Sequence, residues 1–91
     1  MKWFYEPKFY EVRALAYLAQ LLEKPIVANL RLPLLNLPYH ERPEIDGYVE
    51  IENKDWAIEV KSYPLNDQNV YQIVQKYSSL GFERIMIIAL V

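Results

Sequence analysis

The sequence predicts a small α/β fold in which two helices flank a mixed four-stranded sheet. Two segments carry apolar residues at helical spacing, one near the start of the chain and one in its second half. A central segment alternates strictly between apolar and polar residues, and the chain closes on an unbroken apolar run. These patterns give the order helix, three strands, helix, strand, which is typical of helices packed on a sheet.

Size and composition fit one globular domain. The 91 residues are 53% hydrophobic and 24% charged, which is enough apolar sequence for one modest core. Cysteine is absent, which excludes disulfides and thiolate metal sites. No apolar run approaches the roughly 20 residues that cross a bilayer, and no signal-peptide pattern opens the chain. We therefore expect no membrane partner and a cytoplasmic location. The formal net charge of −2 is unlike that of basic domains that bind nucleic acid non-specifically.

The first helix is predicted for residues 8–24. Pro7 suits its start, and Pro25 ends it because the residue before a proline is disfavoured in the helical region. The residues expected on its buried stripe are Val12, Leu15, Leu18, Ala19 and Leu22. Residues 25–35 are β-branched and apolar and predict the first strand, and prolines then mark a loop over residues 33–43.

A β-hairpin is predicted next. Residues 44–52 alternate strictly between apolar and polar, and residues 56–63 predict the returning strand. The intervening Asn-Lys-Asp, residues 53–55, predicts a short turn. On the first of these strands we expect one face to carry Ile45, Gly47, Val49 and Ile51.

A second helix and a final strand complete the predicted order. The helix is predicted for residues 66–81, and Gly81 stands where a C-terminal cap belongs. Its inner stripe is expected to comprise Val70, Ile73, Val74, Tyr77 and Leu80. The apolar run over residues 83–91 is typical of a strand covered on both faces.

Charged residues of the hairpin are the candidates for chemistry. Asp46 lies on one strand, and Glu59 and Lys61 share a face of the next, so antiparallel pairing would bring them within side-chain reach. Mg²⁺ prefers oxygen ligands and typically takes one or two protein carboxylates. A lysine beside the ion would neutralise charge on a phosphoryl oxygen, or help to orient and deprotonate a water. Glu11, in line with the buried stripe of the first helix, is a fourth candidate, because a carboxylate facing a core needs a partner or a metal.

The segments EIDGYV and AIEVKSY together resemble the core signature of the PD-(D/E)XK nuclease superfamily. In that signature an aspartate at the start of one strand is followed by Glu-x-Lys on the next, and here Asp46 precedes Glu59 by thirteen residues. The order of elements and the glutamate on the first helix resemble the same family, so the likeness covers essentially the whole chain. The two segments are most similar to those of the small archaeal Holliday-junction resolvases. The resemblance implies a restriction-endonuclease-like αβββαβ core, with residues 1–91 as a single, minimal nuclease-like domain.

The same resemblance implies hydrolysis of DNA phosphodiester bonds with Mg²⁺ or Mn²⁺. Asp46 and Glu59 would bind the ion together with the backbone carbonyl of Val60, and Lys61 would be the catalytic lysine. Glu11 would be an accessory ligand. Many relatives also use a glutamine of the second helix, and the residues that could fill this role are Gln72 and Gln75.

Partners and rival interpretations complete the expectations. We expect a homodimer, since two sites could cut both strands and the contact would bury the aromatic segment over residues 2–10. No Gly-rich phosphate loop is present, so no nucleotide cofactor is expected.

Taken alone, Glu59 and Lys61 also fit a solvated surface pair. The acidic net charge favours an alternative function, a non-catalytic or regulatory interaction domain of a larger nucleic-acid-processing protein. His40 lacks the partners of a hydrolytic triad.

Overall fold

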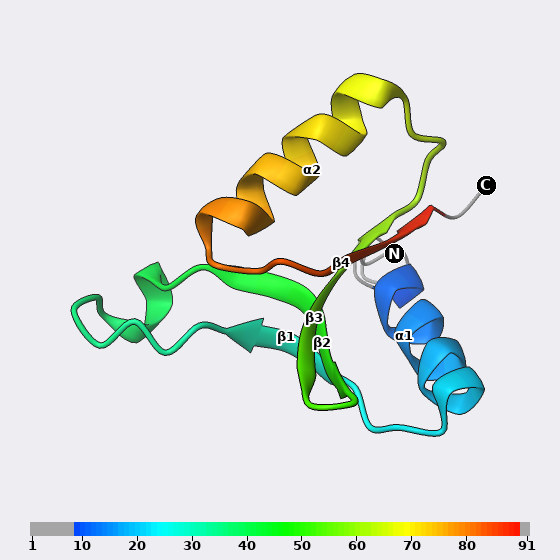
Figure 1. Ribbon diagram of the computed structural model, residues 1–91, viewed down its shortest axis with the longest axis horizontal. Coiled ribbons are helices and arrows are strands. Elements are labelled where there is room, and N and C mark those ends of the chain that lie inside the picture. The colour runs from blue at the N-terminus through cyan, green and yellow to red at the C-terminus, as the bar shows by residue number, and fades with distance from the viewer. Residues whose placement is uncertain (1–8, 90–91) are drawn as a thin grey trace, which may run out of the picture.

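A computed structural model describes residues 9–89 as two helices packed on a four-stranded sheet (Figure 1). The elements are α1 (Phe9–Leu22), β1 (Val27–Arg31), the 3₁₀ turn η2 (Tyr39–Glu41), β2 (Glu44–Ile51), β3 (Lys54–Lys61), α2 (Asp67–Ser79) and β4 (Ile85–Ala89). This order confirms the predicted α/β class and the sequence of helices and strands. Neither described helix is long and apolar enough to cross a membrane.

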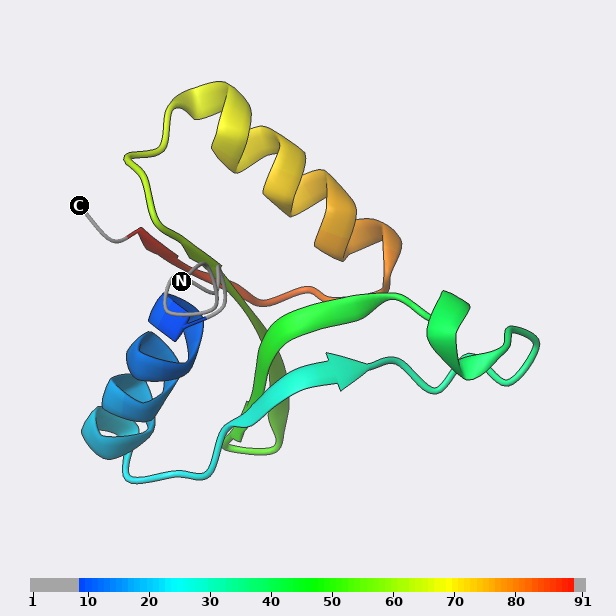
Figure 2. The same ribbon diagram turned by 180° about the vertical axis from the view of Figure 1, so that it is seen from behind.

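The sheet is mixed and has the order β1-β2-β3-β4. β1, β2 and β3 pair antiparallel, and β4 runs parallel to β3. The β2–β3 turn lies at Glu52 and Asn53, whose φ angles are 53° and 63°, rather than over the predicted residues 53–55. Two consecutive left-handed residues are the geometry of a type I′ turn, whose twist matches that of the strands it joins. Seen from behind, β1 and β2 extend together away from α1 toward the loop that carries η2 (Figure 2).

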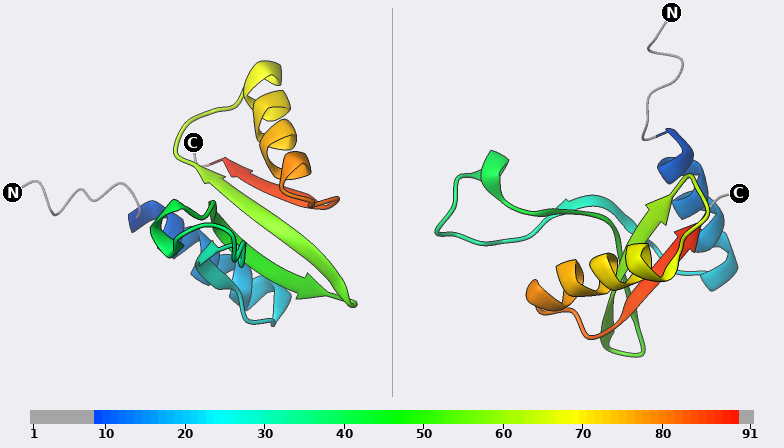
Figure 3. Two further views of the ribbon diagram at one scale, coloured as in Figure 1. Left: turned by 90° about the vertical axis from the view of Figure 1, so that its left-hand side faces the viewer. Right: turned by 90° about the horizontal axis from the view of Figure 1, so that it is seen from above.

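The helices cover opposite faces of the sheet, so the core has two parts (Figure 3). The part under α2 contains Leu32, Ile45, Ala57, Ile73 and Tyr77. The part under α1 contains Leu15, Val49, Ile58 and Val60. The expectation that Ile45 and Val49 share one face is therefore wrong: the two residues serve different parts of the core.

Both helices bury a narrower stripe than the sequence predicts. Val12 on α1 is 53% exposed, and Val70 and Val74 on α2 are 37% and 40% exposed. Within the described residues each helix lies against the sheet alone, so only the line of side chains facing the sheet is covered. β4 also departs from the prediction, because its residues Ile85–Ile88 are only half-buried. Among residues 9–89 it is the last strand of the sheet, with a neighbour on one side only.

Glycine at position 47 lets α1 approach β2 closely. A Cβ atom there would lie 2.8 Å from Cδ2 of Leu15 and 3.3 Å from Cβ of Ile58. Both distances are shorter than ordinary packing contacts, so a side chain at position 47 would require Leu15 or Ile58 to shift. The glycine thus allows Leu15 of α1 to pack directly against β2, one residue after Asp46.

Candidate active site

Asp46 and Glu59, the carboxylate pair, lie where β2 and β3 diverge. The ladder between the two strands extends from Ile51↔Lys54 to Gly47↔Ile58, and Asp46 and Glu59 occupy the next facing positions. There the backbone N–H of Val60 donates to Oδ2 of Asp46 at 2.9 Å. A side-chain oxygen thus takes the N–H at the point where the regular ladder ends. The predicted approach of Asp46 to Glu59 is present.

Glu59 is 4% exposed and is surrounded by three donors. The hydroxyl of Tyr77 donates to its Oε1, and Nζ of Lys76 lies 3.7 Å from the same oxygen. Nζ of Lys61 lies 3.2 Å from Oε2. A buried carboxylate is stable only with such partners, and here α2 supplies two of them and β3 the third.

These contacts shift the pKa values of the two carboxyl groups in opposite directions. Burial raises the pKa of Asp46 and the neighbouring negative charge of Glu59 raises it further, which outweighs the hydrogen bond from Val60. Burial also favours the neutral form of Glu59. However, the hydrogen bond from Tyr77 and the charges of Lys76 and Lys61 outweigh burial and lower the pKa of Glu59. Glu59 therefore keeps its charge more readily than an ordinary glutamate, and Asp46 keeps its charge less readily than an ordinary aspartate.

Lys61 and the hydroxyl of Tyr77 are held in their protonated forms. Partial burial opposes the charge of Lys61, but the hydrogen bond to Glu59 and its charge prevail and raise the pKa of the ammonium. Burial and the same carboxylate raise the pKa of the Tyr77 hydroxyl well above its ordinary value. Lys61 is thus a cation at neutral pH, and Tyr77 is a donor.

A cavity of about 180 Å³ opens beside Glu59, between the end of β3 and α2. Its lining residues are Glu59, Lys61, Tyr63, Asn69, Gln72, Ile73 and Lys76. Gln72 therefore shares this cavity with Glu59 and Lys61. The side-chain amide of Gln75 instead donates to the hydroxyl of Tyr71 at 2.9 Å. Of the two glutamines suggested by the sequence, Gln72 is the one beside the candidate site.

Glu11 does not join the carboxylate pair in one metal-holding cluster. It is a buried residue of α1, one turn before Leu15. Between residues 9 and 89 no group of three or more acidic or histidine side chains is placed to hold a metal ion. Val60 buries its side chain under α1 and turns its N–H to Asp46. His40 is exposed in the loop, where its carbonyl accepts a hydrogen bond of 3.4 Å from Arg31.

The site also contains Lys76 and Tyr77, which are not among the residues predicted for it. The ring of Tyr77 lies in the core, as predicted, but its hydroxyl reaches Glu59. A tyrosine on a buried stripe is itself a signal, because a buried hydroxyl usually finds a hydrogen-bond partner. A buried glutamate on the facing strand is the partner to look for. Lys76 precedes Tyr77 and carries no sequence signal of its own.

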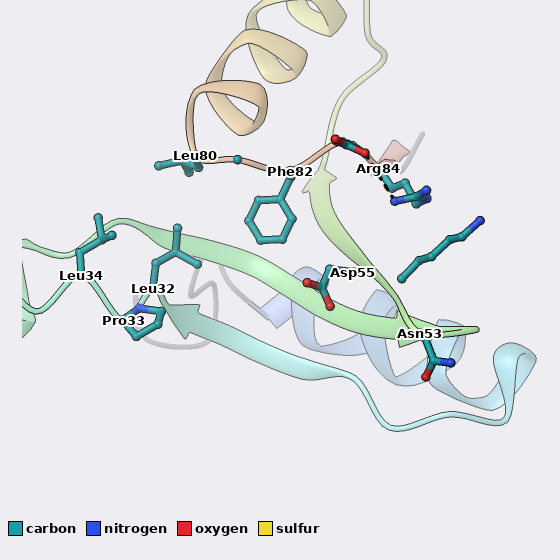
Figure 4. A pocket seen from close by; sticks show the side chains of 11 residues that line it. Leu32, Pro33, Leu34, Asn53, Asp55, Leu80, Phe82 and Arg84 are labelled. Atoms are coloured by element: carbon teal, nitrogen blue, oxygen red, sulfur yellow. Dashed lines mark ion pairs between the residues drawn. The ribbon is translucent and has the colours of Figure 1, made fainter.

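A larger cavity, of about 460 Å³, lies near the other end of β3 (Figure 4). Phe82 and Leu32 point into it from opposite walls. Three of its charged groups already have partners: Arg84 pairs with Glu83 at 3.9 Å, and Asp55 accepts a hydrogen bond of 2.5 Å from Tyr48. Because this cavity contains neither carboxylate of the pair, the smaller one is the candidate active site.

Comparison of the chain with protein-family models, with curated proteins and with solved structures finds no match. Inference about function therefore starts from the geometry of this site.

Proposed function

We propose that the protein is a metal-dependent nuclease of the PD-(D/E)XK type that hydrolyses DNA phosphodiester bonds. The observation that carries this proposal is the position of Asp46 and Glu59 on two diverging strands, with Lys61 in contact with Glu59 at 3.2 Å. The order α-β-β-β-α-β and the mixed sheet also agree with the restriction-endonuclease-like core that the sequence resembles.

The carboxylate pair fits a divalent cation. Mg²⁺ and Mn²⁺ prefer oxygen ligands, and Mg²⁺ commonly takes only one or two protein carboxylates and keeps several waters. The pKa of Asp46 is raised in part by the charge of Glu59, so a cation between them would relieve a repulsion that the fold has built in. A bound divalent ion supplies charge neutralisation at phosphoryl oxygens and a more acidic water.

The protein's own groups would perform the remaining tasks. Lys61 is protonated, so its role is to stabilise negative charge on the phosphate rather than to remove a proton from water. Tyr77 and Lys76 hold Glu59 in place through Oε1. Gln72, which also lines the cavity, would contact the phosphate or an attacking water.

A homodimer remains part of this proposal. The aromatic segment that suggested it begins at residue 2, and its residues 2–8 lie outside the described residues. The described part of α1 adds exposed apolar side chains, at Val12, Tyr17 and Leu21, that a second copy could cover.

The second candidate function is a non-catalytic nuclease-like domain. It is favoured by the pairing of Glu59, both of whose oxygens already contact groups of the chain itself. In such a domain the two lysines would replace the metal permanently.

Titration of Mn²⁺ by calorimetry separates these functions. We expect one specific site in the wild type and an affinity at least about tenfold weaker in Asp46→Asn, since a ligand charge is removed. Glu50→Gln is the matched control, because it neutralises an exposed carboxylate of the same strand. Absence of binding at millimolar Mn²⁺, even with DNA present, would favour the non-catalytic domain.

A further inference from the structure

Asn29 adopts an unusual backbone conformation for a residue inside a strand. It is the third of the five residues of β1, yet its φ angle is 53°. That is the left-handed region, which L-residues other than glycine occupy at a cost and which interrupts the extended strand. Asparagine tolerates it better than most residues, but glycine would adopt it most easily.

Asn29 lies at the position facing Asp46. Ala28 pairs with Gly47 and Leu30 pairs with Ile45, so the residues between them, Asn29 and Asp46, face each other across β1 and β2. The distortion of β1 thus occurs at the level where β2 leaves β3 and the carboxylate pair begins.

The side chain of Asn29 is a second unfavourable feature, in addition to its backbone conformation. Its Oδ1 atom is buried and accepts no hydrogen bond within residues 9–89. Buried polar atoms without a partner are rare in folded proteins, and each one calls for an explanation such as a ligand or an ion. Glycine at this position would avoid both the backbone strain and the buried oxygen.

We propose that Asn29 contributes its side-chain oxygen to the cation site of Asp46 and Glu59. The inference rests on the proposed metal-dependent function and adds a neutral oxygen donor to its two carboxylates. Amide carbonyl oxygens are suitable ligands for hard divalent cations. Backbone strain of this kind persists at binding and catalytic sites because the function requires the side chain.

The test compares Asn29→Gly with the wild type, using Mn²⁺ alone as the probe. Asn29→Gly should raise the midpoint of urea unfolding, because it relieves the left-handed strain and removes the buried oxygen. The same variant should bind Mn²⁺ at least about tenfold more weakly in calorimetry. A purely structural role for Asn29 would leave the affinity unchanged in the folded variant.

Asn29→Asp is the second variant, and it keeps both an oxygen donor and a residue that tolerates the left-handed region. It should bind Mn²⁺ at least as tightly as the wild type. A wild type that binds Mn²⁺ while Asn29→Gly binds it equally well would overturn this inference alone. Loss of binding in Asn29→Asp would also contradict it. A wild type without any Mn²⁺ site would remove the proposed function itself.

Discussion

Replacing Lys61 by alanine is expected to reduce Mn²⁺-dependent cleavage of DNA by at least about 100-fold. Nζ of Lys61 lies 3.2 Å from Glu59, on the strand that carries half of the carboxylate pair. Because its pKa is raised, the ammonium remains charged, and in the proposed reaction it would lie beside the developing negative charge on the phosphate. Its loss would remove a fixed positive charge that no solvent molecule replaces with the same orientation. Cleavage rates of a labelled duplex and a labelled junction would measure the effect.

Lys76→Ala is the matched control for this experiment. It removes the same charge from the same carboxylate, but Lys76 is more distant, at 3.7 Å, and its side chain is 51% exposed. Exposed ion pairs contribute little, so we expect cleavage to fall less than about tenfold. Equal losses in the two variants would mean that the lysines only neutralise Glu59. Wild-type cleavage by Lys61→Ala would rule out its assignment as the catalytic lysine.

Neutralising the two carboxylates one at a time is expected to change stability in opposite directions at neutral pH. Glu59→Gln should lower the free energy of unfolding by about 2 kcal/mol, because it weakens charge-assisted hydrogen bonds from Tyr77 and Lys61 in a buried position. Asp46→Asn should raise it, because the folded protein disfavours the charge of Asp46 while an asparagine oxygen can still accept from Val60. Urea unfolding of the metal-free proteins measures both changes.

The pH dependence of these two changes follows from the pKa shifts. The pKa of Glu59 is lower in the folded than in the unfolded chain, so its charge stabilises the fold above its ordinary pKa. That stabilisation is lost as the pH falls through the pKa that Glu59 has in the folded protein. The loss of unfolding free energy caused by Glu59→Gln should become smaller over the same range. The pKa of Asp46 is raised on folding, so the gain from Asp46→Asn should also disappear in acid. Urea unfolding at a series of pH values below neutrality follows both changes. Stability changes of the same sign in both variants would contradict these electrostatics.

The order of elements could be predicted because apolar spacing reports secondary structure directly. Leu15 and Ile73, both on predicted stripes, are buried against the sheet. What spacing could not report is how much of each helix is covered. Val12 and Val74 lie on the same stripes yet remain exposed, because helix coverage depends on neighbouring layers and not on the helix itself. Nor does alternation along β2 report that Ile45 and Val49 join different parts of the core.

The part of the site that lies within one hairpin was predictable, and the part that comes from elsewhere was not. Alternation along adjacent strands is sufficient to place Asp46 beside Glu59. Lys76 and Tyr77 reach Glu59 only because α2 packs at a particular angle and height over the sheet, which local pattern does not determine. Glu11 is buried, as its place on the predicted helical stripe requires, but burial alone does not direct a carboxylate to the pair.

The most direct measurement is anomalous diffraction from crystals soaked in Mn²⁺, because it locates the ion without reference to activity. We predict an anomalous peak bonded to carboxylate oxygens of both Asp46 and Glu59, with the ammonium of Lys61 moved off Oε2. A peak at another place, or crystals without one in which Lys61 still holds Glu59, would contradict a cation site between these two residues.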